Sequence, residues 1–171
     1  MLRVALPDAR AGAVETVGEV APGDPLLADA DWPLAEPLRV TGRFSGAGEG
    51  MFYWKVHLRT VVRAECRRCL VPVELPVKAD LGLIFSAGDD APEGEGCYQV
   101  PPRTQVLDLT GAVREEMLLA MPHFVECRPD CRGLCPSCGA NLNEGPCGCA
   151  SPGDPRWDAL RALTPPDPQT D

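Results

Sequence analysis

The chain has 171 residues, of which 16 are basic and 25 acidic, so its formal net charge is −9. An acidic chain cannot coat nucleic acid through its overall charge, and any such contact must come from a local patch. No apolar run approaches the roughly 20 residues that span a bilayer, and the N-terminus lacks the apolar region of a secretion signal. We therefore expect a cytoplasmic protein without membrane contact, whose thiols stay reduced.

Residues 1–37 are rich in alanine, proline, glycine and acidic residues. Leu2–Leu6 could form a short strand, but four prolines between residues 22 and 37 exclude a long helix or a central strand there. We expect an irregular segment that Trp32 attaches to the rest of the protein.

Three later stretches alternate apolar and polar residues, as strands with one buried face do. They are Leu38–Phe44, Met51–Glu65 and Val71–Phe85. Pro72 and Pro76 lie on one face of the third stretch and favour an edge or bulged strand. Cys66-Arg67-Arg68-Cys69 then falls at the tip of a hairpin. Residues 86–103 begin with an acidic, glycine-rich run and predict a mobile loop.

Asp108–Met121 predicts the one convincing helix, with Asp108 or Thr110 as its cap and Pro122 as its end. The predicted fold is therefore α+β: a mostly antiparallel β-sheet with one packed α-helix. We assign residues 1–125 to this β-rich domain and residues 126–150 to a C-terminal Cys-rich zinc-binding loop segment. Residues 151–171 would form a short amphipathic helix and a tail.

Six of the nine cysteines lie between Cys127 and Cys149. Cys135-Pro-Ser-Cys138-Gly139 has the spacing of a zinc knuckle, in which two thiolates turn onto one ion and the glycine supplies a positive φ. Four thiolates complete a closed tetrahedral site, so the ion would be structural. A disulfide cluster is the alternative interpretation, and an iron–sulfur cluster is a third.

The spacing leaves the ligand set open. The ligands that we expect for this zinc ion are Cys127, Cys131, Cys135 and Cys138, with Cys147 and Cys149 as alternatives and Cys66 and Cys69 as a possible second half-site. Six thiolates are too many for one mononuclear site, so some are spare or a second ion takes them together with Cys66 and Cys69. The Cys66–Cys69 pair could instead be packed thiols or a redox pair. A redox pair normally lies at a helix N-terminus, and no helix is predicted there.

One face of the predicted strand Met51–Glu65 carries cations that continue into the hairpin tip. This basic strip consists of Tyr53, Lys55, Arg59, Arg63, Arg67 and Arg68. We prefer to interpret it as a solvated face paired with carboxylates on neighbouring strands. In the functional alternative its cations contact RNA phosphates, and Tyr53 stacks on a base.

Several motifs together resemble the YceD family. They are Glu65-Cys66-Arg67-Arg68-Cys69-Leu70, Asp108-Leu109 with Glu115-Glu116, Leu118 and Met121-Pro122, Cys131-Arg-Gly-Leu-Cys135-Pro-Ser-Cys138-Gly139, Asn141-Leu142-Asn143 and Asp154-Pro155-Arg156. The resemblance implies a role in the accumulation of 23S rRNA, with large-subunit ribosomal RNA or a ribosomal protein as the partner. Because some members of the family lack the C-terminal cysteines, it also implies that the metal is a stabiliser.

The leading hypothesis is a non-enzymatic factor in large ribosomal subunit biogenesis with a structural zinc site and no small-molecule substrate. The chain has no glycine-rich phosphate loop and no Ser/His/Asp set, and it contains only two histidines, so a catalytic zinc of the His-rich kind is not expected. The alternative is a thiol-redox or metal-handling protein that uses Cys66, Cys69 and the C-terminal cysteines.

Overall fold

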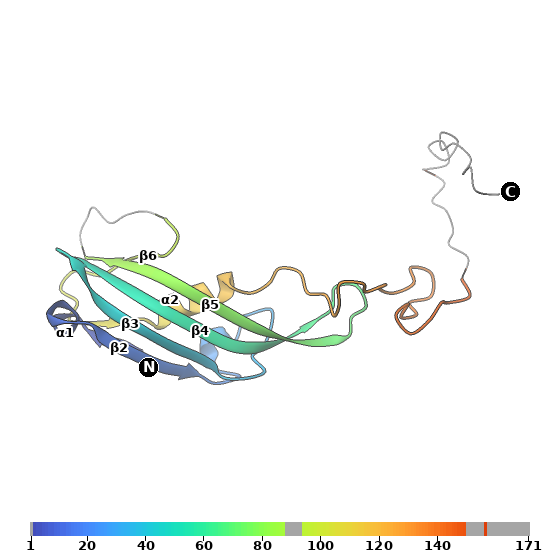
Figure 1. The fold of residues 1–171 in the computed structure, drawn as a ribbon, viewed down its shortest axis with the longest axis horizontal. Helices are drawn as coiled ribbons and strands as arrows, with labels where there is room; N and C mark the ends of the chain where they lie inside the picture. Colours follow the sequence, from blue (N-terminus) through green and yellow to red (C-terminus); the bar gives the residue numbers. More distant parts are fainter. Residues whose placement is uncertain (1, 88–93, 150–155, 157–171) are drawn as a thin grey trace.

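The computed structural model describes residues 2–87, 94–149 and 156. Its main element is a five-stranded sheet in the order β2-β3-β4-β5-β6 (Figure 1). The strands are β2 (Val14–Val20), β3 (Leu38–Gly48), β4 (Met51–Glu65), β5 (Pro72–Ser86) and β6 (Cys97–Gln99). All neighbouring strands are antiparallel except β5 and β6.

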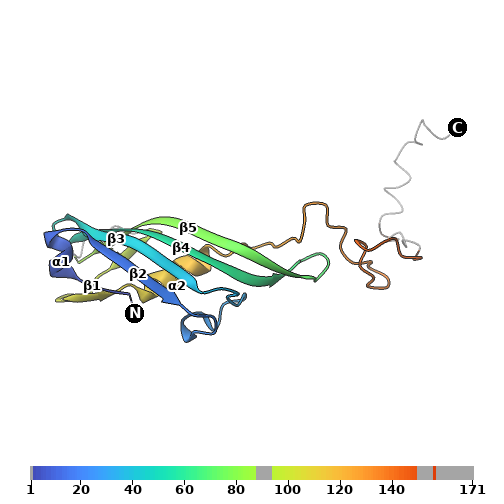
Figure 2. The same cartoon turned by 60° about the horizontal axis from the view of Figure 1, so that its bottom comes forward.

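A second, two-stranded sheet joins β1 (Arg3–Ala5) to β7 (Val106–Asp108). The helices are α1 (Leu6–Ala11), the 3-10 turn η1 (Pro25–Leu27) and α2 (Thr110–Leu119). Figures 1 and 2 show α2 on one side of the five-stranded sheet. The α+β class, the mostly antiparallel sheet and the single main helix agree with the prediction. No helix in the described ranges is both long and apolar enough to cross a membrane.

Strand β4 forms where the alternation predicts it and pairs with β5 along its whole length, from Met51 opposite Ser86 to Glu65 opposite Pro72. Its even-numbered side chains face α2 and are buried, whereas its odd-numbered side chains form the outer face of the sheet. The prolines of β5 lie in its first half, where only β4 pairs with it, because β6 reaches only Ile84–Ser86. An edge position for the proline-containing part is therefore confirmed.

The core lies between the sheet and α2. Its largest fully buried side chains include Trp54, Phe44, Phe52, Leu109 and Met117. The Trp54 indole N–H donates to the Thr16 hydroxyl across 2.8 Å, so the buried polar atom of the indole is satisfied. Glu116 is buried on α2, and its carboxylate accepts a hydrogen bond from the Tyr98 hydroxyl at 2.8 Å.

The structure differs from the expected irregular segment over residues 1–37, because β1, α1, β2 and η1 all lie in it. Strand β2 ends before the four prolines begin, so they do not interfere with it. Thr16 and Val20 point into the core, and Val14–Val20 pairs with β3 residues 38–44. Val14 packs partly against the core as well, but Thr16 is polar and position 18 is glycine, so the sequence of β2 has no clear alternating pattern.

The other boundaries shift by a few residues. Helix α2 begins at Thr110 with Leu109 at its N-cap position, so neither Asp108 nor Thr110 is the cap that was predicted. Asp108 precedes the cap, and its Oδ1 accepts the Thr110 backbone N–H at 2.9 Å. In the predicted loop 86–103, β6 forms as a short strand, and residues 88–93 lie outside the described ranges. The predicted C-terminal helix also lies outside them, apart from Arg156.

Candidate metal centres

The first candidate centre begins at the hairpin tip that joins β4 to β5. The Leu70 N–H donates to the Cys66 carbonyl at 2.8 Å, and the Cys66 N–H donates to the Val71 carbonyl at 2.9 Å. These bonds turn both thiols of Cys66-Arg67-Arg68-Cys69 to one side. Leu70 has a φ of 60° in this turn, in the left-handed region that a side chain disfavours.

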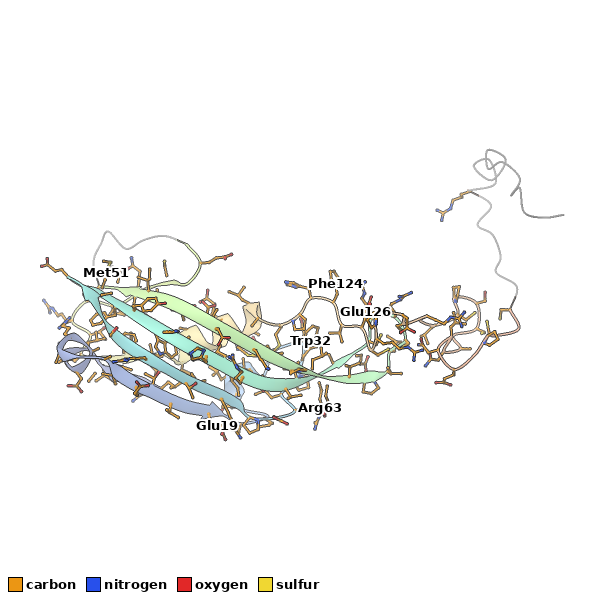
Figure 3. The ribbon with its side chains drawn as sticks, viewed as in Figure 1. Glu19, Trp32, Met51, Arg63, Phe124 and Glu126 are labelled. Carbon is orange, nitrogen blue, oxygen red and sulfur yellow. The ribbon has the colours of Figure 1, made fainter. Side chains whose placement is uncertain are left out.

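The segment after α2 runs back along this tip. The Arg67 N–H donates to the Val125 carbonyl at 2.9 Å, and the Arg67 guanidinium donates twice to the Glu126 carboxylate, at 2.9 and 3.1 Å. The same guanidinium lies 4.7 Å from the centre of the Phe124 ring. Figure 3 shows Phe124 and Glu126 on the irregular segment that approaches the hairpin tip. These contacts bring Cys127 to the thiols of the hairpin.

Four thiols meet at this point: Cys66, Cys69, Cys127 and Cys131. All their sulfurs lie within 4.8 Å of one another. The Cys66–Cys131 sulfurs are 3.8 Å apart and the Cys69–Cys127 sulfurs 3.6 Å apart. A tetrahedral ion with metal–sulfur bonds of about 2.3 Å places its sulfurs about 3.8 Å apart, whereas a disulfide needs about 2.05 Å. The spacing therefore fits an ion, and these cysteines are free thiols.

The second candidate centre is built around Cys135-Pro136-Ser137-Cys138. The Gly139 N–H donates to the Cys135 carbonyl at 2.9 Å, and Gly139 has a φ of 72°. The Ser137 N–H donates to the Cys135 sulfur at 3.4 Å. With Cys147 and Cys149 the four sulfurs again lie within 4.8 Å of one another. This knuckle repeats the turn of the hairpin tip, with glycine where the tip has leucine.

Asn143 connects the two centres. It lies in the loop of the second centre, but its side-chain N–H donates to the Cys131 sulfur of the first at 3.4 Å. Its side-chain oxygen accepts from the Arg132 backbone N–H at 2.8 Å and from the Arg128 guanidinium at 2.9 Å. One amide therefore fixes both the position of a first-centre sulfur and the backbone that carries it.

In each group the surroundings lower the pKa of some thiols, which favours the thiolate that binds metal, and raise the pKa of others, namely Cys69 and Cys127 in the first group and Cys147 and Cys149 in the second. Burial opposes ionisation of Cys66, but backbone N–H groups of Cys127 and the hairpin tip outweigh it and lower its pKa to about 6. Backbone N–H groups, with that of Cys138 first, lower the pKa of Cys135 to about 6 as well. The hydrogen bond between the Cys149 thiol and the Cys138 sulfur, followed by charge repulsion from Cys138, raises the pKa of Cys149 to about 12.

The structure groups the predicted ligands differently from the expected set. Cys127 and Cys131 do not join Cys135 and Cys138; instead each pair has its own partners. The first pair meets Cys66 and Cys69, which were predicted as a second half-site, and the second pair meets the alternatives Cys147 and Cys149. The sequence signal for two centres is the presence of two C-x-x-C turns, each of which lacks a second pair of ligands.

The basic strip is largely paired with carboxylates. Arg59 contacts Asp80 at 2.6 Å, Arg63 contacts Glu74 at 3.5 Å, and Arg67 contacts Glu126 as described above. His57 also bonds to Asp80. These pairs follow the preferred interpretation of a solvated face.

Of the remaining strip residues, Lys55 and Arg68 make no side-chain ion pair within the described ranges. Tyr53 is 41% exposed and packs over Gly82, where a built Cβ would lie 2.3 Å from the Tyr53 hydroxyl. The strip therefore does not act as a continuous set of free cations.

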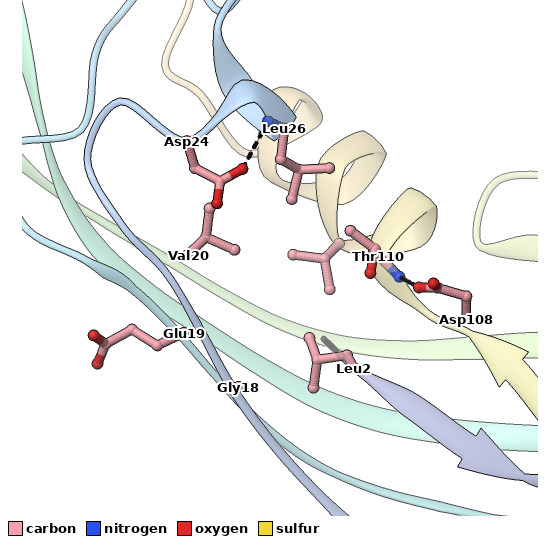
Figure 4. Close-up of a pocket in the computed structure, with 9 residues that line it drawn as sticks. Leu2, Gly18, Glu19, Val20, Asp24, Leu26, Asp108 and Thr110 are labelled. Atoms are coloured by element: carbon pink, nitrogen blue, oxygen red, sulfur yellow. Dashed lines mark hydrogen bonds between the residues drawn. The ribbon is translucent and has the colours of Figure 1, made fainter.

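A pocket of about 340 Å³ lies apart from the thiols, between β2, η1 and α2 (Figure 4). Leu2, Val20, Leu26 and Val113 form much of its wall. Its carboxylates at Asp24 and Asp108 accept the backbone N–H groups of Leu26 and Thr110, each at 2.9 Å. These two side chains are therefore engaged in shaping the backbone.

The family described as large ribosomal RNA subunit accumulation protein YceD matches residues 54–164, which include both centres. An uncharacterised protein of Mycobacterium tuberculosis is 36% identical over 110 residues, covering 62% of this chain and 52% of its own length. The Arabidopsis thaliana chloroplast protein named large ribosomal RNA subunit accumulation protein YCED homolog 1 is 30% identical over 122 residues, covering 54% of this chain and 37% of its own length.

The chain therefore spans about half, or less, of the length of the curated relatives that it matches. No solved structure matches it.

Proposed function

Because the chain belongs to the YceD family of large ribosomal RNA subunit accumulation proteins, we propose that it is a non-enzymatic factor in the accumulation of large-subunit ribosomal RNA and that each thiol tetrad holds one structural zinc ion. The observation that carries the proposal is the division of eight family-region cysteines into two closed groups of four sulfurs. The names of the Arabidopsis and maize relatives support the ribosomal role.

Four thiolates fill the coordination shell of a zinc ion, which leaves no open position for a substrate. The first ion would be held by Cys66, Cys69, Cys127 and Cys131, and the second by Cys135, Cys138, Cys147 and Cys149. When bound, each ion would crosslink segments that have little apolar surface of their own, since only Val71, Val73 and Leu134 are aliphatic side chains packed against the first group among the described residues. Metal binding therefore replaces a hydrophobic core in this part of the chain.

The second candidate function is thiol-redox or metal-handling activity, which the lowered pKa values of Cys66 and Cys135 favour. Both sulfurs are buried, however, and each has three further thiols around it. A redox exchange needs a thiolate that a second disulfide can reach. The arrangement therefore supports permanent ligands better than cycling thiols.

Metal analysis of the purified chain tests the zinc proposal. We expect two zinc ions per chain, and one ion in each of the variants Cys66→Ser and Cys135→Ser. A matched control is Cys97→Ser, which removes a thiol that belongs to neither tetrad and should keep both ions. A metal-free chain that stays folded, or a disulfide within either group, would overturn the proposal.

The ribosomal role is tested separately by deleting the gene and measuring the ratio of large- to small-subunit ribosomal RNA. We expect the ratio to fall and to recover when the intact gene is returned. An unchanged ratio would contradict the role without touching the zinc proposal.

A further inference from the structure

We propose that the outer face of the five-stranded sheet binds the phosphate backbone of single-stranded RNA, anchored by a cross-strand row of Arg39, Arg59 and Lys78. The proposal rests on the function proposed above and names the partner and the surface that contacts it. Only Arg59 belongs to the basic strip found in the sequence. Arg39 and Lys78 come from the neighbouring strands, and only the register of the sheet places them beside Arg59.

The register sets the three cations side by side. Arg39 on β3 lies opposite Arg59 on β4, which in turn lies opposite Lys78 on β5. Like charges that are directly opposite each other destabilise a sheet. Glu19 on β2 lies opposite Arg39 on its other side, but no ion pair joins the two within the described ranges. A row of cations that costs stability is a feature that an anionic partner would explain.

Arg59 is rigidly held in the middle of the row. Its guanidinium donates to the carbonyls of Leu58 and Ala79, at 2.9 and 3.1 Å, and to the Asp80 carboxylate at 2.6 Å. Arg39 and Lys78 are exposed, and neither has a side-chain partner within the described part of the chain. The row therefore has one unpaired cation, Arg39 or Lys78, on each side of the fixed guanidinium of Arg59.

A hollow of about 330 Å³ adjoins the row. Its lining combines the three cations with apolar surface from Val61, Pro37 and Pro76 and with one carboxylate, that of Glu36. A volume of this size is at the low end of small-molecule sites, which run from about 300 to 1,000 Å³. Apolar surface beside cations matches one nucleotide unit, in which an apolar base face adjoins an anionic phosphate.

A second pair of cations extends the surface along the strands. Arg43 on β3 lies opposite Lys55 on β4, four residues from Arg39 and Arg59 respectively. Four residues of strand span about 13 Å, so an extended backbone with several phosphates can reach both cation groups. Lys55 has no ion-pair partner in the described ranges, and Arg43 contacts Glu15 only at 4.0 Å.

Charge argues for RNA over a basic polypeptide at this face. The chain carries −9 overall, and each zinc tetrathiolate would add negative charge near the hairpin tip, because four thiolates exceed the charge of one Zn²⁺. A basic partner would therefore be attracted elsewhere and repelled by this row. An anionic strand has the opposite preference, and the site is a local patch of the kind that an acidic protein needs to contact nucleic acid.

The test measures binding of a fluorescein-labelled 12-nucleotide single-stranded RNA to the zinc-loaded full chain over a range of salt concentrations. The variant Arg39→Glu with Lys78→Glu should bind about tenfold more weakly or worse. Its plot of log affinity against log salt should flatten by about 1.4, since each phosphate contact to a single strand contributes about 0.7. The charge-matched control is Arg10→Glu with Arg103→Glu.

The control changes two exposed cations off this face. Arg10 lies over the ring of Phe52, whose side chain faces the core side of the sheet, and Arg103 lies in the loop after β6. All four substituted positions are exposed, and unchanged circular dichroism verifies folding.

Equal binding by the two double variants would overturn the proposal, because the loss of RNA affinity would then follow from the change in net charge and not from the position of the cations. Absence of RNA binding by the wild-type chain at low salt would overturn it too. If the chain then still purifies with large-subunit precursors, the proposed function stands and its partner is a protein. Competition by inorganic phosphate at concentrations equal to the RNA phosphate would show a site for the free anion and would overturn the assignment to RNA.

Discussion

The two candidate metal centres are built on the same turn but hold the chain together in different ways. In each, the residue after a C-x-x-C pair has a positive φ and its N–H donates to the carbonyl of the first cysteine. In the first centre that residue is Leu70, and in the second it is Gly139. The first centre joins a hairpin tip to a segment some sixty residues away in sequence, whereas the second closes on residues of its own loop.

This difference implies a division of labour. The first centre is mostly buried and lies against the β-domain, with contacts through Arg67 and through the Leu134 N–H, which donates to the Arg68 carbonyl at 3.1 Å. The second has two exposed thiols, at Cys138 and Cys149. The first should therefore determine where the Cys-rich segment lies, and the second should determine only how that segment folds.

The largest expected effect separates the two roles. A structural zinc site in a small domain contributes an apparent ~10–16 kcal/mol, so loss of either ion should unfold the part that depends on it. Cys66→Ser should remove the protection of the Arg67 and Leu134 amides from hydrogen exchange. Cys135→Ser should leave the Arg67 amide protected, because its partner Val125 belongs to the first centre's side of the segment.

Hydrogen exchange followed by mass spectrometry provides the measurement, with Cys97→Ser as the control. Loss of protection at Arg67 in Cys135→Ser would show that the two centres fold as one unit. The distinction between a first centre that joins distant segments and a second centre that closes on its own loop would then fail.

The first centre is also the part of the site whose ligand set could not be predicted from the sequence. The spacing Cys135-x-x-Cys138-Gly139 identifies a knuckle, because its turn is local. Cys127 and Cys131 lie just before it in sequence and were assigned to it for that reason. Their true neighbours lie at the tip of the β4–β5 hairpin, and only the path of the chain after α2 brings them together.

The next effect concerns the connection between the centres. Asn143→Asp keeps the oxygen that accepts from the Arg132 N–H but replaces the N–H that donates to the Cys131 sulfur with a carboxylate oxygen. Loss of such an outer partner typically weakens metal binding by about 10–100-fold. We expect this loss at the first centre, although Asn143 lies in the loop of the second.

Competition titration with a chromophoric chelator, repeated in the Cys66→Ser background that keeps only the second ion, assigns the loss to the first centre if it disappears in that background. Glu144→Gln is the control, since Glu144 contacts only the neighbouring Asn141 among the described residues. Weakening confined to the second centre would show that Asn143 merely supports its own loop.

Exposure predicts a third difference, in the rate at which a chelator removes zinc. The exposed sulfurs of Cys138 and Cys149 can be attacked directly, whereas Cys66, Cys69 and Cys131 are buried. If burial adds only about 1.4 kcal/mol to the barrier, the first ion should leave about tenfold more slowly. Stopped-flow release should show one fast and one slow equivalent, and the fast phase should be missing in Cys135→Ser. A single phase with two equivalents would mean that burial does not protect the first centre.

The strands of the β-domain could be predicted from the sequence where each has one buried face and one solvent-exposed face. Met51–Glu65 satisfies this condition along its whole length, so its bounds and both faces followed from the alternation. Strand β2 does not, because Val17 is 77% exposed and Gly18 stands over Leu2. The row Arg39–Arg59–Lys78 could not be predicted from any single strand, because the register of three strands brings its residues together.

The smallest effect tests the turn itself. Leu70 is 57% exposed, so Leu70→Gly loses little burial and removes a left-handed conformation that costs an L-residue about 1–2 kcal/mol. The greater freedom that glycine gives the unfolded chain offsets about 0.4–1 kcal/mol of this gain, so the net stabilisation should lie between about 0 and 1.6 kcal/mol. Gly139→Leu should lose about the same amount, through backbone strain alone, because nothing lies within 4 Å of a Cβ built at Gly139.

The opening free energies of the Leu70 and Gly139 amides, from hydrogen exchange of the zinc-loaded protein, measure both changes. Each amide donates to the carbonyl of the first cysteine of its knuckle, so each reports on its own turn. Opposite signs of similar size would establish that the turns are equivalent and that the hairpin tip tolerates a strained leucine because the surrounding β-domain holds it. If Leu70→Gly instead weakens its turn, the leucine side chain stabilises the first centre through packing, and the two knuckles differ in more than their setting.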